Sequence, residues 1–254
     1  MIPTESANDR ANNMNGIDLY NTLKECLRKE AVKAELLDEL VSIKCKVLTA
    51  REAIGDPEHR DYPILVGKES MVEAEFMGSK GQAFADDYQN IELTIGELLK
   101  IDLDNNKNRS TFIAAYNAIF RHLGLCEKTI HCRDEEPVEC ASKLSEAIPL
   151  DAKVLLIGFQ PRFLEYLAEK YQVRAIDLDK DNIGTERFGV MIEPPEATDA
   201  AIEWCDYILA TGSTIANGSV TGFVNTGKPT LFYGTSIAAP AISLGLTTYC
   251  QLGH

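Results

Sequence analysis

Small polar residues gather directly after an apolar run in the C-terminal half of the chain. The run spans residues 207–209, and the candidate binding residues that follow it are Thr211, Gly212, Ser213, Thr214 and Asn217. Hydroxyl groups and free backbone N–H groups at the start of a helix can bind an anion or a carbonyl oxygen. Capping one helix uses only one hydroxyl, so three hydroxyls in four residues favour a binding site over a simple tight turn.

A second candidate turn follows the apolar run 154–157. Gly158 comes directly after this run and is followed by Gln160 and Pro161. A glycine at a strand-to-helix turn lets the backbone approach a ligand, although turn geometry alone explains the glycine equally well. The sequence lacks the GxGxxG fingerprint here, which argues against ordinary NAD binding at this turn.

Two carboxylates, Asp177 and Asp179, follow the next apolar run. Asp177 lies nineteen residues after Gly158, a spacing at which an acidic residue often accepts hydrogen bonds from ribose hydroxyls. The pair could equally hold a hard cation, or simply be solvated at the end of a strand. We therefore treat Asp177 as a candidate ligand-binding residue and both aspartates as candidate metal ligands.

Other residue types argue against zinc and serine-hydrolase chemistry. Seven cysteines are scattered along the chain, with no CxxC pair and no compact zinc spacing, so we expect reduced core thiols. No GxSxG elbow is present. Asn117 lies in the otherwise apolar segment AAYNAIF, where a buried amide needs a hydrogen-bonding partner. That partner is either a ligand or a neighbouring loop.

Composition limits the class of partner. The chain has 254 residues, is 45% hydrophobic and carries a formal net charge of −14. The acidic excess argues against binding to nucleic acid or to an anionic membrane surface. No run approaches the roughly 20 apolar residues of a membrane span, and the polar N-terminus does not resemble a signal peptide. We therefore expect a cytoplasmic protein, with a homodimer as the default assembly.

The pattern of apolar residues predicts four segments. They are a flexible tail (1–16), a small α+β domain (17–101), a connecting loop and helix (102–125), and an α/β domain (126–254). Strands alternate with helices throughout the last segment, which predicts a doubly wound sheet with right-handed crossovers.

Within the α+β domain we expect one long helix followed by strands and a short helix. The strands are predicted over residues 41–50, 62–68 and 71–85, and Thr94 with Glu97 has the spacing of a capping box. Ser110 is predicted to cap the connecting helix and Gly124 to end it.

Four segments taken together resemble a known family. The segments are IGFQP, DLD with NIG shortly after it, ATGSTIANGSV and FYGTS, and they resemble the DUF364 family, which is labelled for heavy-metal chelation. The resemblance runs from about residue 17 to the end. It implies an enolase N-terminal-like domain of the DUF4213 type, a Rossmann-like C-terminal domain and a ligand site in the cleft between them. The residues onto which that site falls are Gly158, Gln160, Pro161, Asp177, Thr211, Gly212, Ser213, Thr214, Asn217 and Asn117.

Three hypotheses about function follow. The first is a two-domain protein that binds a small molecule, a metal or a metal complex in the interdomain cleft. The alternative is a transferase-like enzyme with a nucleotide-type cofactor such as S-adenosylmethionine, which depends on the spacing of Gly158 and Asp177. The third is a structural or partner-binding protein. If the ligand is a metal, Asp177 and Asp179 suit a hard cation better than a soft one.

Overall fold

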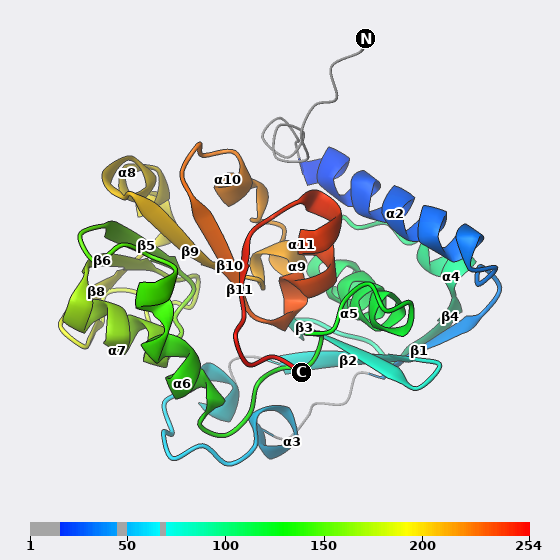
Figure 1. The fold of residues 1–254 in the computed structure, drawn as a ribbon, viewed down its shortest axis with the longest axis horizontal. Coiled ribbons are helices and arrows are strands. Elements are labelled where there is room, and N and C mark those ends of the chain that lie inside the picture. The colour runs from blue at the N-terminus through cyan, green and yellow to red at the C-terminus, as the bar shows by residue number, and fades with distance from the viewer. Residues whose placement is uncertain (1–15, 45–49, 67–69) are drawn as a thin grey trace, which may run out of the picture.

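A computed structural model describes residues 16–44, 50–66 and 70–254 and shows a mixed α/β protein with two β-sheets (Figure 1). All but the last residue of the predicted tail 1–16 lies outside the described residues, as do residues 45–49 of the strand expected over 41–50; Ala50, its last residue, begins a helix instead. No helix in the described part is both long and apolar enough to cross a membrane.

The N-terminal part of the chain contains a four-stranded antiparallel sheet. Its elements are α2 (Gly16–Lys33), β1 (Leu40–Lys44), α3 (Ala50–Ile54), the 3-10 helix η1 (Pro63–Val66), β2 (Ser70–Phe76), β3 (Ser79–Ala85), β4 (Ile91–Thr94), α4 (Ile95–Leu98) and α5 (Asn106–His122). The strand order is β3-β2-β1-β4. The predicted capping box starts α4: Thr94 Oγ1 accepts a hydrogen bond from Glu97 N, and the Glu97 carboxylate accepts one from Thr94 N.

The C-terminal part contains a seven-stranded sheet. Its elements are α6 (Glu136–Ser142), η2 (Leu144–Glu146), β5 (Lys153–Ile157), α7 (Pro161–Lys170), β6 (Gln172–Ile176), β7 (Glu186–Arg187), β8 (Val190–Glu193), η3 (Pro195–Ala197), α8 (Thr198–Trp204), β9 (Tyr207–Thr211), α9 (Thr214–Asn217), α10 (Thr221–Val224), β10 (Thr230–Tyr233), η4 (Thr235–Ile237), α11 (Ala238–Leu244) and β11 (Thr248–Tyr249). The strand order is β11-β10-β9-β5-β6-β8-β7, and all neighbours are parallel except β7 with β8. The chain runs outward from β5 through β6 and β8 before it crosses to β9, so the order reverses between β5 and β9.

Alternate side chains of β5 pack on opposite faces of this sheet. Val154 and Leu156 belong to a cluster that includes Leu164 of α7, whereas Leu155 and Ile157 belong to the larger cluster on the other face. Burial on both faces explains why the strand is apolar throughout. Each such side chain contributes roughly 1.5–3 kcal/mol on full burial.

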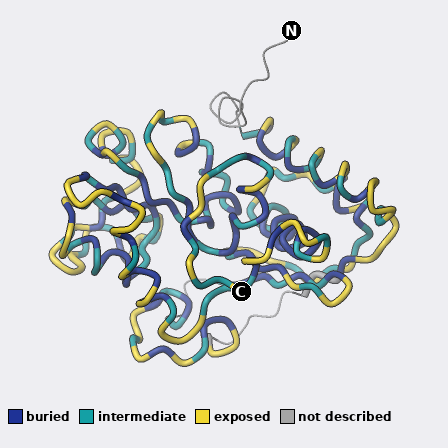
Figure 2. The backbone as a smooth tube through the Cα atoms, in the orientation of Figure 1, coloured by how far each residue is buried: buried dark blue, intermediate teal, exposed yellow. Residues whose placement is uncertain are grey.

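Helix α5 lies in the core of both parts. It packs across β2 and β3 of the first sheet and also contacts α9 and α11, and residues 110–120 are all buried. The cluster that holds Phe112 of α5 also contains Ile208 and Phe232 of the seven-stranded sheet. Figure 2 shows α5 as a buried coil at the junction of the two parts. The predicted connecting helix is therefore a central packing element, and one continuous core joins the two sheets.

Two local predictions are wrong. The strand expected over 62–68 is the 3-10 helix η1 as far as Val66, and Pro63 at its start has no N–H to donate to a sheet. Ser110 does not cap α5, because the helix begins one turn earlier, where the Asn105 side chain accepts a hydrogen bond from Asn108 N at 2.9 Å. Ser110 is instead buried within the helix, and its hydroxyl donates to Lys107 O at 3.0 Å.

Candidate functional site

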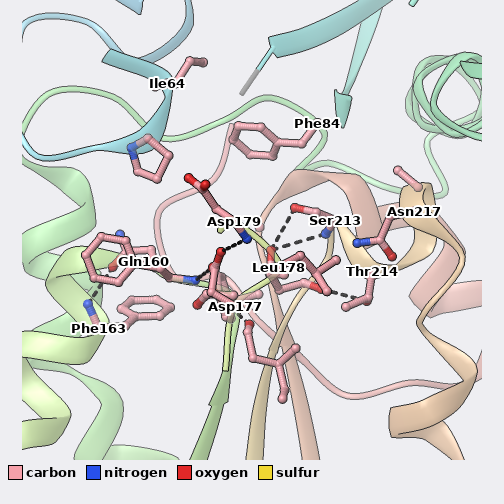
Figure 3. Close-up of a pocket in the computed structure, with 18 of the residues that line it drawn as sticks. Ile64, Phe84, Gln160, Phe163, Asp177, Leu178, Asp179, Ser213, Thr214 and Asn217 are labelled. Atoms are coloured by element: carbon pink, nitrogen blue, oxygen red, sulfur yellow. Dashed lines mark hydrogen bonds between the residues drawn. The ribbon is translucent and has the colours of Figure 1, made fainter. Parts of the chain in front are cut away.

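A cavity of about 960 Å³ is lined by residues of both parts of the chain. Figure 3 shows Ile64 and Phe84 of the N-terminal part on one side, facing Asp177 and Ser213 of the C-terminal part. The seven-stranded sheet contributes the carboxyl ends of its strands, which is where open α/β sheets bind ligands, beside the reversal in strand order. The volume is typical of a small-molecule site.

Most of the predicted site residues line this cavity. They are Gly158, Gln160, Pro161, Asp177, Asp179, Thr211, Ser213, Thr214 and Asn217. Gly212 and Asn117 are not among the described residues that line it. Gly212 lies behind the wall, where its N–H donates to Tyr233 O at 2.6 Å. A Cβ atom on Gly212 would lie 2.9 Å from Ile237 N, so this glycine allows β9 to pack closely against η4.

Asn117 has a structural role in place of the ligand contact that the resemblance implies. Its side chain is buried, its amino group donates to Gln82 O at 2.9 Å and to Thr235 O at 3.0 Å, and its Oδ1 accepts from Ala239 N at 3.0 Å. These three bonds use both N–H groups and the oxygen of the amide. Asn117 therefore links α5 to β3 on one side and to η4 and α11 on the other, which is the loop-bridging alternative for a buried amide.

The turn after β5 is fixed by close packing and a helix cap. Gly158 has a φ of +85°, and a Cβ atom there would lie 2.6 Å from Thr211 Cγ2, so the ends of β5 and β9 touch at this point. Gln160 caps α7, because its Oε1 accepts a hydrogen bond from Phe163 N at 2.6 Å. Pro161 follows as the first residue of the helix, where a missing N–H is tolerated.

Local hydrogen bonds use most of the hydroxyl groups in the turn after β9. The Thr211 and Ser213 hydroxyls lie 2.9 Å apart, and Thr214 Oγ1 donates to Thr211 O at 2.8 Å. Asn217 Oδ1 accepts from both N and Oγ of Ser219, at 3.0 and 2.7 Å. The three hydroxyls therefore hold the turn in shape through local hydrogen bonds, a role that goes beyond the capping of one helix.

Arg109 of α5 supports the same turn from behind. Its Nε donates to Ala216 O at 3.1 Å, and its Nη2 lies 3.4 Å from Asn217 O. These two carbonyls lie at the C-terminal end of the four-residue helix α9. A helix of this length is not stable on its own. Gly218 follows with a φ of +88°, and a Cβ atom there would lie 3.2 Å from Arg109 Cζ. Arg109 is thus a positioning residue for this wall of the cavity.

The two candidate metal ligands are adjacent, but backbone groups already bind their carboxylates. Asp177 Oδ2 accepts from Phe159 N at 2.5 Å and its Oδ1 accepts from Asp179 N at 2.7 Å. Asp179 Oδ1 accepts from Asp181 N at 2.9 Å. Within the described ranges, no three or more His, Cys, Asp or Glu side chains are arranged to hold a metal ion.

Three cysteines that line the cavity are poor thiolate donors. Burial, together with the nearby Glu136 carboxylate, raises the pKa of Cys132 to about 12. Burial also raises the pKa of Cys140 to about 11 and raises that of Cys250. Because the thiolate is the form that binds soft metals, a raised pKa makes these three thiols poor ligands for a soft metal.

Two residues that line the cavity have buried hydroxyl oxygens. Within the described part of the chain, neither Tyr62 Oη nor Thr235 Oγ1 has a hydrogen-bonding partner. Sequence reasoning identified neither residue, although Thr235 lies in the quoted segment FYGTS. An unsatisfied buried hydroxyl costs about 1–3 kcal/mol, and such groups in native structures often mark a functional region.

Thr235→Val is expected to raise the free energy of unfolding by about 1 kcal/mol, because valine fills the same space without the unsatisfied hydroxyl. Urea denaturation measures the change. Thr214→Val is the matched control, since it removes a hydroxyl that does donate to Thr211 O and should lower stability by about 1 kcal/mol. A loss of stability in Thr235→Val would show that the Thr235 hydroxyl does have a hydrogen-bonding partner and would contradict the prediction.

The fold and the site together define a mixed α/β protein with a cavity of small-molecule size between two sheets. Residues 141–230 match the model of the DUF364 family, described as "Putative heavy-metal chelation", so this part of the chain is similar to that family. Among curated proteins no match was found.

Two solved structures of DUF364 proteins, both titled as proteins of unknown function, are similar to this chain. The protein from Pyrococcus horikoshii has a TM-score of 0.53 and 17% identity, and the alignment covers 86% of this chain and 79% of that one. The protein from Desulfitobacterium hafniense has a TM-score of 0.48 and 13% identity, with coverage of 68% and 71%. The first likeness supports the fold alone.

Proposed function

We propose that the protein binds a small organic molecule, or a metal carried within such a molecule, in the cavity between the two sheets. The observation that carries the proposal is the cavity of about 960 Å³, lined from both parts of the chain by apolar rings and a few polar side chains. That combination is the usual character of a ligand site. Its position beside the carboxyl ends of parallel strands adds support.

A metal at this site would arrive with ligands of its own. Asp177 and Asp179 are the two candidate carboxylates, and backbone N–H groups already bind both of them. A hard cation can be held by two carboxylates with water in its remaining positions, but both Asp177 oxygens and Asp179 Oδ1 already accept hydrogen bonds from backbone N–H groups. The heavy-metal description of the family therefore fits a metal complex in the cavity better than a bare metal ion.

A transferase-like protein with a nucleotide-type cofactor such as S-adenosylmethionine is a second candidate. Numbered along the chain, the six parallel strands have the order 3-2-1-4-5-6, which is the order of doubly wound dinucleotide-binding folds. This order favours a Rossmann-like C-terminal domain, whereas the enolase N-terminal-like assignment of the first part stays a prediction. Asp177 follows the second of these strands, where an acidic residue often binds a ribose.

A variant with a blocked cavity tests the proposal. Ser213 lines the cavity, and Ser213→Trp should fill part of it, whereas Ser142→Trp places the same side chain on the exposed end of α6. A diverse library of neutral, cationic and anionic compounds, including metal chelates, is screened by thermal shift on all three proteins. A compound at 100 times its Kd stabilises by about 2.7 kcal/mol, or roughly 5–10 °C.

We expect at least one compound to shift the melting temperature of the wild type and of Ser142→Trp, but not that of Ser213→Trp. Compounds that shift all three proteins equally bind elsewhere. A library with no compound that distinguishes Ser213→Trp from its control would refute a small-molecule site in this cavity.

A further inference from the structure

We infer that the cavity selects an uncharged or cationic nitrogen heterocycle without a phosphate group, and that the amino groups of Gln160 and Asn217 recognise its acceptor atoms. This inference rests on the proposed small-molecule binding and adds the chemical class of the ligand. It depends on three features of the cavity: the orientation of two carboxamides, the sign of the lining charge and the aromatic rings of the lining.

The two carboxamides present amino groups to the cavity because their oxygens are held elsewhere. Gln160 Oε1 accepts from Phe163 N at 2.6 Å, and Asn217 Oδ1 accepts from N and Oγ of Ser219. An amide oxygen that accepts from backbone fixes which end of the group is the donor. Both residues line the cavity and are only half-buried, so their amino groups are accessible. Figure 3 shows them on either side of Asp177 and Asp179.

The charge around the cavity is acidic. The described lining residues include five aspartates and one lysine, which are Asp86, Asp134, Asp177, Asp179, Asp181 and Lys180. Phosphate sites in proteins are built from Arg, Lys and free backbone N–H groups. A phosphorylated ligand would therefore meet a net repulsive field, whereas a neutral or cationic ligand would not.

Aromatic side chains supply the rest of the lining. Phe84 of the N-terminal part and Phe159 and Phe163 of the C-terminal part all contribute to the cavity surface. Phe163 is itself fixed by an edge-to-face contact with Tyr233, whose ring centroid is 4.9 Å away. Apolar rings and oriented donors in one cavity suit a flat ring that carries acceptor nitrogens or carbonyl oxygens. A purine nucleoside has these features.

Calorimetric titration of the wild-type protein with adenosine, S-adenosylmethionine, AMP and ATP tests the selection. We expect adenosine or S-adenosylmethionine to bind at least tenfold more tightly than AMP or ATP at low salt. The gap between ATP and adenosine should narrow as salt is raised, because salt screens repulsion between charges. Equal or tighter binding of AMP or ATP would overturn the inference, although a small-molecule site in the cavity would stand.

Two nearly isosteric variants test the carboxamides. Gln160→Glu and Asn217→Asp keep the oxygen that accepts from the backbone but replace the amino group with a second acceptor. We expect each variant to weaken adenosine binding about tenfold. Each variant loses one hydrogen bond and leaves an acceptor of the protein facing an acceptor of the ligand. The melting temperature without ligand should stay within about 2 °C of the wild type. S-adenosylmethionine, which is cationic, should lose less affinity than adenosine.

The outcomes separate the inference from the proposed function. Adenosine binding that is unchanged in both variants would overturn the role of the carboxamides. If none of the four compounds binds the wild type, the assigned ligand class is wrong. The library screen with Ser213→Trp then decides independently whether the cavity binds small molecules at all.

Discussion

Gly81→Ala is expected to destabilise the protein by about 3 kcal/mol or more. Gly81 lies in β3, and a Cβ atom there would lie 2.2 Å from Ala118 N and 2.5 Å from Ala114 O, both in the backbone of α5. A backbone atom cannot rotate away as a flexible side chain can. The methyl group would therefore push α5 away from β3 at this point.

Urea denaturation of Gly81→Ala against the wild type measures this loss. The matched control is Gly222→Ala in α10, because no atom lies within 4 Å of a Cβ built on Gly222. Alanine is a better helix former than glycine, so the control should be neutral or slightly stabilising. A loss below about 1 kcal/mol in Gly81→Ala would mean that α5 can shift without cost, contrary to its dense packing.

Local signals predicted much of the fold. The Thr94 capping box depends on residues three apart, and the apolar run of β5 depends on burial on both faces, so each can be recognised from a few neighbouring residues. Both predictions are confirmed. The cap at Ser110 failed for a related reason: Asn105 offers the same chemistry one turn earlier, and only tertiary packing buries Ser110.

The N-terminal wall of the cavity could not be predicted in the same way. Strand ends in a parallel sheet must meet at one edge, so Gly158, Asp177 and Thr211 could be grouped from topology alone. Tyr62 and Phe84 reach that edge only through the packing of one sheet against the other. No periodicity or spacing within the sequence encodes such a contact, since it depends on how α5 joins the two sheets.

Asn117→Leu is expected to lower the free energy of unfolding by about 3–5 kcal/mol. Leucine has a similar branched shape, but it is larger and would leave Gln82 O, Thr235 O and Ala239 N without the partner that Asn117 provides. Each unsatisfied buried group costs about 1–3 kcal/mol. Lys107→Ala on the same helix is the control, because it removes only an exposed ion pair with Asp87 and should cost under about 1 kcal/mol.

The same variant tests whether the two sheets unfold together. Asn117 bonds to β3 of the first sheet and to η4 and α11 beside the second, and α5 lies in the core of both. Asn117→Leu should therefore lower the urea midpoint of a single transition, seen equally by the fluorescence of Trp204 in α8 and by far-ultraviolet circular dichroism. If the Trp204 signal kept the wild-type midpoint while the dichroism midpoint fell, the second sheet would be stable without α5. The two sheets would then be separate folding units, and the stability of the cavity that both line would not follow from the stability of one sheet.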